Sequence, residues 1–146
     1  MSKIARFGLF ILAICMLAAC GSAASSTATI QKFTVTAREF AFDPMELDVT
    51  SGQPVEITLQ NQGTIEHDFS IQEIDLAGAP TATGAMHMHD GGHMMSDQPK
   101  LHVAAAAGSQ GMLTFTPMKA GQYQFYCTVA GHKEAGMVGV LTVKAS

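Results

Sequence analysis

Apolar and polar residues alternate in short runs from Ile30 to the end of the chain, which is typical of half-buried β-strands. Turn-forming residues separate the runs, as in Ser51-Gly52-Gln53-Pro54. No convincing helical run interrupts the pattern. The strands that it predicts cover residues 33–37, 45–49, 55–59, 67–71, 101–105, 111–115, 121–126 and 137–143. Seven or eight short strands joined by turns favour an all-β fold, a β-sandwich.

The strand expected at 121–126 has two different faces. Tyr123, Phe125 and Cys127 fall on one face because successive side chains of a strand point to opposite sides. The polar Gln124 falls on the other face. Aromatic side chains favour the core, so the parity directs Cys127 toward the interior.

The segment after this strand contains three potential metal ligands. Cys127, His132 and Met137 follow one another at intervals of five residues, in the pattern C-x4-H-x4-M. A loop between adjacent strands can bring three such side chains to one point. A soft sulfur, an imidazole and a weak thioether are donors that copper accepts in both oxidation states. A site of this kind uses a second imidazole, and His67, at the start of an apolar alternating run, is the best candidate.

The residues around these ligands carry a family resemblance, which rests on the motifs Tyr126-Cys127, Gly131-His132 and Gly136-Met137-Val138-Gly139. The motifs resemble the copper-binding loop of the cupredoxins, or blue copper proteins, and their spacing is closest to that of the auracyanins. The resemblance covers roughly residues 30–143, apart from one insertion. It implies a Greek-key cupredoxin sandwich that holds one type 1 copper ion through His67, Cys127 and His132, with Met137 as a long axial ligand. Such a set lies between the geometries that Cu(I) and Cu(II) prefer.

Two residues beside the ligands acquire a role from the same resemblance. The family places the hydrogen bonds that fix the cysteine loop next to the ligands, which here implies Asp68 and Thr128. Asp68 is a departure, because related proteins commonly carry Asn at that position. A carboxylate can accept a bond from a backbone N–H but cannot donate as an amide does. An ionised Asp68 near the copper should favour Cu(II) and lower the reduction potential.

The first 29 residues resemble an export and anchoring segment. Lys3 and Arg6 precede an apolar run of 13 residues at 7–19, shorter than the ~20 residues that span a bilayer, so 1–19 is predicted to be a signal peptide. Leu17-Ala18-Ala19-Cys20 resembles a bacterial lipobox, which would leave Cys20 acylated. An ordinary signal peptide with an incidental cysteine is the alternative. Residues 20–29, rich in Ser, Ala, Thr and Gly, form a predicted flexible spacer before the domain at 30–146.

Cysteine usage and charge narrow the functional classes. Of the three cysteines, Cys15 lies in the predicted signal and Cys20 at the predicted lipid attachment, which leaves Cys127 as a free thiol. An unpaired thiol in an exported domain is either a liability or a ligand. The formal net charge is −4, which argues against a nucleic-acid partner. We expect a monomer held at the outer face of a bacterial membrane, periplasmic or cell-surface, by its N-terminal lipid.

An insertion at about 75–100 breaks the strand pattern. It is long for a loop without structure of its own, which usually indicates function or disorder. It contains three histidines and four methionines, namely Met86, His87, Met88, His89, His93, Met94 and Met95, and His102 lies just downstream. His-rich tracts suggest metal binding, and thioethers favour Cu(I). The tract is therefore either a secondary site for additional Cu(I) or a polar, solvated loop.

Three functional classes are compatible with these features. A one-electron carrier, exchanging electrons with redox proteins, needs only the mononuclear copper site and is the interpretation that we favour. A copper chaperone or sequestration protein would use the Met/His-rich insertion instead. A copper enzyme of the nitrite reductase or multicopper oxidase kind needs further histidines for a second copper centre, commonly beside the cysteine. Tyr126 and Thr128 flank Cys127 here, so the sequence indicates that the protein is not an enzyme.

Overall fold

The computed structural model describes residues 29–84 and 98–146. The predicted signal peptide, Cys20 and the Met/His-rich tract 86–95 lie outside these ranges. The described residues form ten strands: β1 (Gln31–Arg38), β2 (Ala41–Asp43), β3 (Glu46–Thr50), β4 (Val55–Asn61), β5 (His67–Ile71), β6 (Thr81–Thr83), β7 (Leu101–Ala105), β8 (Gln110–Phe115), β9 (Gly121–Tyr126) and β10 (Val138–Lys144). No helix occurs among them, and so none that is long and apolar enough to cross a membrane.

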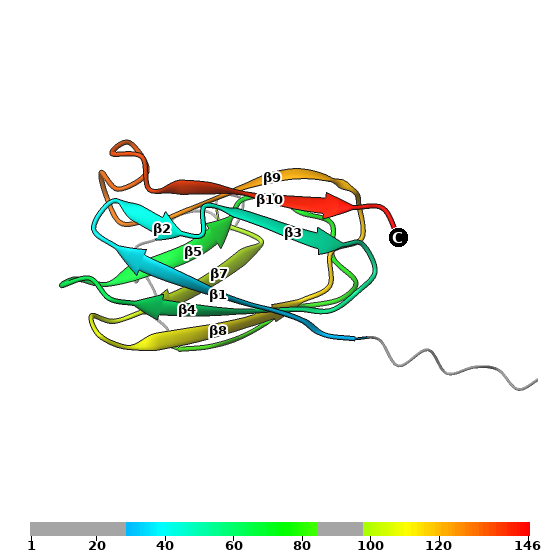
Figure 1. The fold of residues 1–146 in the computed structure, drawn as a ribbon, viewed down its shortest axis with the longest axis horizontal. Coiled ribbons are helices and arrows are strands. Elements are labelled where there is room, and N and C mark those ends of the chain that lie inside the picture. Colours follow the sequence, from blue (N-terminus) through cyan, green and yellow to red (C-terminus); the bar gives the residue numbers. More distant parts are fainter. Residues whose placement is uncertain (1–28, 85–97) are drawn as a thin grey trace, which may run out of the picture.

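The strands form two five-stranded sheets that pack face to face (Figure 1). Sheet one has the order β2-β1-β4-β8-β6, and sheet two has the order β3-β10-β9-β5-β7. The pairs β1–β4 and β3–β10 are parallel, and the other pairs are antiparallel. The prediction of an all-β sandwich is therefore confirmed.

All eight predicted strands are present; β5, β7 and β9 have the predicted bounds, and the ends of the others differ by at most two residues. The count of seven or eight was too low, because two strands of three residues each, β2 and β6, complete the edges of sheet one. Strand β6 pairs with β8 inside the segment assigned to the insertion, so part of that segment belongs to the sandwich. Strands this short carry almost no periodic signal.

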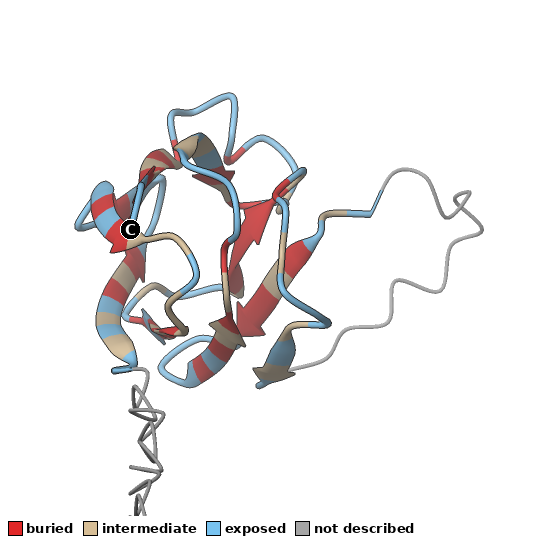
Figure 2. Cartoon of the chain, turned by 90° about the vertical axis from the view of Figure 1, so that its right-hand side faces the viewer, coloured by how far each residue is buried: buried red, intermediate tan, exposed pale blue. Residues whose placement is uncertain are grey.

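The core lies between the sheets and follows from the alternation. In β4, Val55, Ile57 and Leu59 are fully buried, whereas the residues between them are partly exposed. Figure 2 shows this alternation as bands along several strands. Strand β5 differs, because all five of its residues are buried, including His67 and Asp68. Polar residues in such a strand need partners, which makes β5 the natural place for a site.

Three connections meet at one end of the sandwich, on the left of Figure 1: the β1–β2 turn, the β4–β5 loop and the β9–β10 loop. The β4–β5 loop leads into His67, and the β9–β10 loop contains Cys127 and His132. The β1–β2 turn comes from sheet one, whereas β5, β9 and β10 belong to sheet two. This end therefore gathers side chains from both layers.

Candidate metal centre

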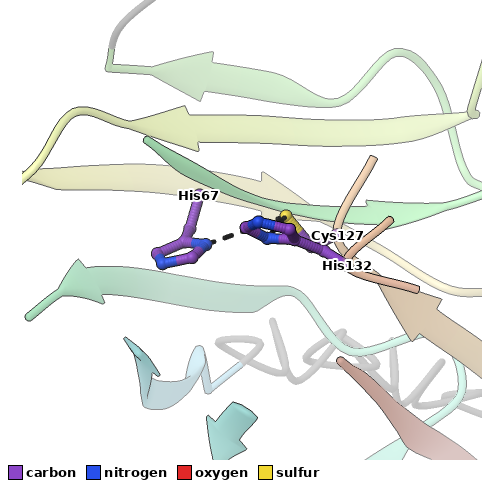
Figure 3. A group of neighbouring side chains, drawn as sticks. All are labelled: His67, Cys127 and His132. Atoms are coloured by element: carbon purple, nitrogen blue, oxygen red, sulfur yellow. Dashed lines mark hydrogen bonds between the residues drawn. The ribbon is translucent and has the colours of Figure 1, made fainter. Parts of the chain in front are cut away.

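Three of the four predicted copper ligands converge at this end. His67 opens β5, Cys127 directly follows β9, and His132 lies in the loop before β10. One ligand atom from each lies within 4.8 Å of the others, and all three residues are buried. The Cys127 sulfur is 3.6 Å from Nδ1 of His132 and 4.0 Å from Nδ1 of His67 (Figure 3).

This geometry fits a transition metal held by three donors. With bonds of about 2.0 Å to nitrogen and 2.3 Å to sulfur, taken from protein zinc sites, a planar trigonal set separates nitrogen from sulfur by about 3.7 Å. The two observed sulfur–nitrogen distances, 3.6 and 4.0 Å, lie on either side of that value. Thiolate with two imidazoles is a donor set that suits copper. The residues present therefore fit the ion that the donor chemistry implies.

Backbone hydrogen bonds hold the ligand loop in shape. The His132 N–H donates to the Val129 carbonyl at 3.0 Å, and the Met137 N–H donates to the His132 carbonyl at 2.9 Å. The Cys127 N–H donates to the Met137 carbonyl at 3.2 Å, which closes the loop at its base. Gly136 has a φ of 100°, which favours glycine at that bend. The regular spacing in the sequence thus corresponds to a short closed loop.

Met137 is the fourth predicted ligand, and its side chain is fully buried. Its backbone is bonded to both His132 and Cys127, so the residue lies beside the other donors. Its role as axial ligand remains a prediction.

Asp68 ties the cysteine to β5. The carboxylate is 3% exposed and accepts from the Thr128 N–H at 3.0 Å and from the Thr128 hydroxyl at 2.7 Å. The Ser70 hydroxyl donates to it at 2.8 Å, and the Cys127 thiol donates at 3.6 Å. Nδ1 of His102 lies 2.9 Å from the Ser70 hydroxyl, which extends the network toward the surface. The structure thus contains the predicted contact between Asp68 and Thr128.

Burial determines the protonation of the metal-free site. It raises the pKa of the Cys127 thiol to about 11, and the negative charge of Asp68 adds to this effect. Burial also lowers the pKa of His67, assisted by the nearby His132. A metal needs the thiolate and neutral imidazoles. At neutral pH His67 is ready to bind, whereas Cys127 must first release its proton.

His67 has one unsatisfied ring nitrogen. Its Nδ1 faces the cysteine, while its Nε2 is buried without a hydrogen-bond partner among the residues that the structure describes. A Cβ built on Gly63 would lie 2.6 Å from this Nε2 and 3.0 Å from Oε1 of Glu39. Only a glycine lets the chain pass so close to the imidazole.

Several residues around the centre carry no recognisable signal in the sequence. Glu39 and Phe40 lie in the β1–β2 turn. Glu39 accepts a hydrogen bond from the Thr64 N–H in the loop before His67, and the Phe40 ring packs against His132. Ser70 and His102 extend the Asp68 network. In the sequence, His102 stands out only by its position after the Met/His-rich tract. The only local signal of Phe40 is an aromatic residue in the connection between two predicted strands, and nothing in the sequence indicates which histidine it meets.

Comparison with known proteins supports the same family. Residues 9–143 match the model of the family described as "Cupredoxin-like domain". The copper-resistant cuproprotein CopI of Rubrivivax gelatinosus is 33% identical over 124 residues, which covers 85% of this chain and 71% of that protein. CopI of Pseudomonas aeruginosa is 29% identical, with 85% and 82% covered. Auracyanin A, a "blue" copper protein of Chloroflexus aurantiacus, matches with a TM-score of 0.59 at 24% identity, with 80% of this chain and 100% of that chain covered.

Proposed function

The chain belongs to the cupredoxin-like domain family, and we propose that it is a type 1 copper protein that carries one electron at a time. The observation that supports this proposal most strongly is the buried convergence of Cys127, His67 and His132 within 4.8 Å. Met137, buried beside them, would complete the set as the axial ligand. Bound copper would supply the Cu(I)/Cu(II) couple.

The protein contributes rigidity and electrostatics to this function. Asp68 and the Thr128 backbone fix the end of β9 against β5, so the sulfur and the His67 ring come from two bonded elements. His132 lies on a loop closed by its own backbone bonds. Donors held this way change little in position when an electron arrives or leaves, which favours fast transfer. Tyr126 and Thr128 flank Cys127 where a second copper centre would commonly place a histidine, so we propose a carrier rather than an enzyme.

A second candidate function is copper handling in copper resistance. It is favoured by the two relatives named copper-resistant cuproprotein CopI, of which one is 33% identical. The tract 86–95, outside the described residues, supplies the thioethers and imidazoles that such a role could use. A carrier needs only the buried centre, whereas a copper-handling protein would use the tract 86–95 and would pass its copper on.

One experiment separates the two roles. Purified copper-loaded protein is cycled between oxidised and reduced states, and copper content is measured before and after each cycle. A carrier keeps one copper per chain through reversible cycles, whereas a handling protein loses reduced copper to an acceptor such as a Cu(I) chelator. In parallel, deletion of the gene should sensitise cells to copper only if handling is the role. Irreversible redox behaviour would contradict the carrier proposal.

We further propose export and anchoring through a lipid on Cys20, with redox proteins as partners. The sequence of residues 1–29 supports this proposal; these residues lie outside the described ranges apart from Thr29. Cys20→Ser should release the protein from membranes or leave it unprocessed. Unchanged membrane partition of that variant would favour an uncleaved apolar segment over a lipid.

A further inference from the structure

The β1–β2 turn places an aromatic ring against the metal centre from the opposite sheet. Phe40 packs edge-on against His132, with ring centroids 5.3 Å apart and planes at 71°. His132 is only 5% exposed, whereas Phe40 itself is 52% exposed. Phe40 thus lies between this imidazole and solvent.

The backbone of Phe40 is unusual for its residue type. Its φ is 63°, in the left-handed region, and Phe40 is the one non-glycine residue with positive φ in the described ranges 29–84 and 98–146. Bulky side chains disfavour this region, which glycine and asparagine adopt more readily. Strain of this kind persists where the surroundings over-determine it, and it clusters at functional sites. The position therefore suggests a role for the ring.

The neighbouring residue in the turn acts on the other histidine. Oε1 of Glu39 accepts from the Thr64 N–H at 2.5 Å and from the Thr64 hydroxyl at 2.8 Å. These bonds lower the pKa of Glu39 to about 2, so the carboxylate is ionised at neutral pH. Thr64 belongs to the loop that leads into His67, and Gly63 in that loop passes directly against the imidazole.

Other bonds fasten the same loop to β1. The Arg38 guanidinium donates to the Gln62 side-chain oxygen at 2.7 Å, and the Gln62 N–H donates to the Ala37 carbonyl at 2.9 Å. Glu39, through its two bonds from Thr64, is the last link in this series. The β1–β2 turn of sheet one thus contacts the loop that leads into His67 and the ring of His132.

We propose that Glu39 and Phe40 together are a positioning clasp for the two histidine ligands, which slows the escape of copper from the centre. The inference rests on the proposed function only in that copper occupies the centre. Phe40 keeps the His132 ring from swinging outward and shields it from water. Glu39 holds the loop before His67, so that the unpartnered Nε2 stays enclosed. Neither residue donates to the metal, and both act through the histidines.

The first test replaces the aromatic cover while removing the backbone strain. Phe40→Asn suits a left-handed φ, so the metal-free fold should be at least as stable as the wild type. Loss of supporting contacts around a metal ligand typically weakens metal binding by 10–100-fold, so we expect copper to leave about tenfold faster or more. Release is measured by stopped flow, as transfer of Cu(I) to a strong chelator. Phe40→Leu keeps an apolar side chain over His132, so its rate of copper release should lie between those of the wild type and Phe40→Asn.

A matched control removes an equally exposed apolar side chain elsewhere. Met118 is 52% exposed, like Phe40, and lies in the β8–β9 connection. Met118→Asn should leave release unchanged. NMR of the metal-free proteins adds a readout that needs no copper: the His132 ring resonances should show greater mobility in Phe40→Asn and wild-type mobility in Met118→Asn.

The Glu39 half of the clasp is tested by a rescue pair. Glu39→Ala removes the acceptor for both Thr64 bonds and should speed copper release. Glu39→Gln keeps an acceptor oxygen and should restore most of the slow release. Wild-type release and ring mobility in both Phe40→Asn and Glu39→Ala would overturn the proposal. A wild-type protein that binds no copper would instead refute the proposed function. The two failures are distinguishable because the NMR comparison of ring mobility is made on the metal-free proteins and needs no copper.

Discussion

Replacing Asp68 by Asn is expected to raise the reduction potential of the copper centre. The side chain is 3% exposed, and its Oδ2 lies 3.6 Å from the Cys127 sulfur. Both of its oxygens accept hydrogen bonds from Thr128, as an ionised carboxylate would. A buried negative charge at this distance stabilises Cu(II) more than Cu(I). Asparagine has nearly the same shape and can still accept from the Thr128 N–H, so the fold should survive.

The size of the effect follows from the distance. A metal bonded to the sulfur at about 2.3 Å lies no more than about 6 Å from the carboxylate oxygen. With an effective dielectric constant of about 20, one unit of charge at about 6 Å contributes about 3 kcal/mol. At about 59 mV for each factor of ten, this corresponds to a rise of about 130 mV in the potential.

The assay is a redox titration of the copper-loaded variants, followed by the visible absorption of the oxidised form. Glu134→Gln is the matched control, because Glu134 is an exposed carboxylate in the ligand loop. Solvent and salt screen an exposed charge, so its removal should shift the potential by less than about 20 mV. A fall in potential for Asp68→Asn, or shifts of equal size in both variants, would refute the electrostatic reasoning.

Three further predictions test other parts of the account. Met137→Leu should keep copper bound but raise the potential, because loss of a weak donor destabilises Cu(II) more than Cu(I); an unchanged or lower value would exclude Met137 as axial ligand. Copper binding between pH 7 and 9 should release about one proton and tighten about tenfold per pH unit, because the pKa of the Cys127 thiol is about 11 and burial lowers the pKa of His67. Calorimetry in buffers of different ionisation enthalpy measures the proton release. Binding that is independent of pH would contradict a buried neutral thiol. Replacing 86–95 by a Gly/Ser linker should leave the spectrum and potential of the centre intact, slow loading from dilute Cu(I) and remove any second bound copper; unchanged loading and stoichiometry would show that the tract is a solvated loop.

The sequence predicted what local patterns encode. Alternation identified eight strands, and the parity of β9 correctly directed Phe125 and Cys127 inward, where both are fully buried. The spacing of Cys127 and His132 sets the size of a loop that the backbone closes, so their convergence could be anticipated from the chain itself. The choice of His67 depended on its position at the start of a strand.

The clasp and the Asp68 network could not be predicted in the same way. Phe40 meets His132 across 92 positions of sequence, and Ser70 meets His102 across 32. Such contacts depend on how the two sheets pack and on which strands are neighbours, and no short-range pattern encodes either. Strand β6 could not be predicted for a different reason, because three residues are too few to show a period.

The measurement that tests the central claim most directly is the visible and electron-paramagnetic-resonance spectrum of the copper-loaded protein, compared with that of Cys127→Ser. The account predicts an intense blue charge-transfer band with one copper per chain in the wild type, and loss of that band in a variant whose sandwich remains folded. A colourless wild-type complex, or a variant that stays blue, would contradict the assignment of Cys127, His67 and His132 as the ligands of a type 1 centre.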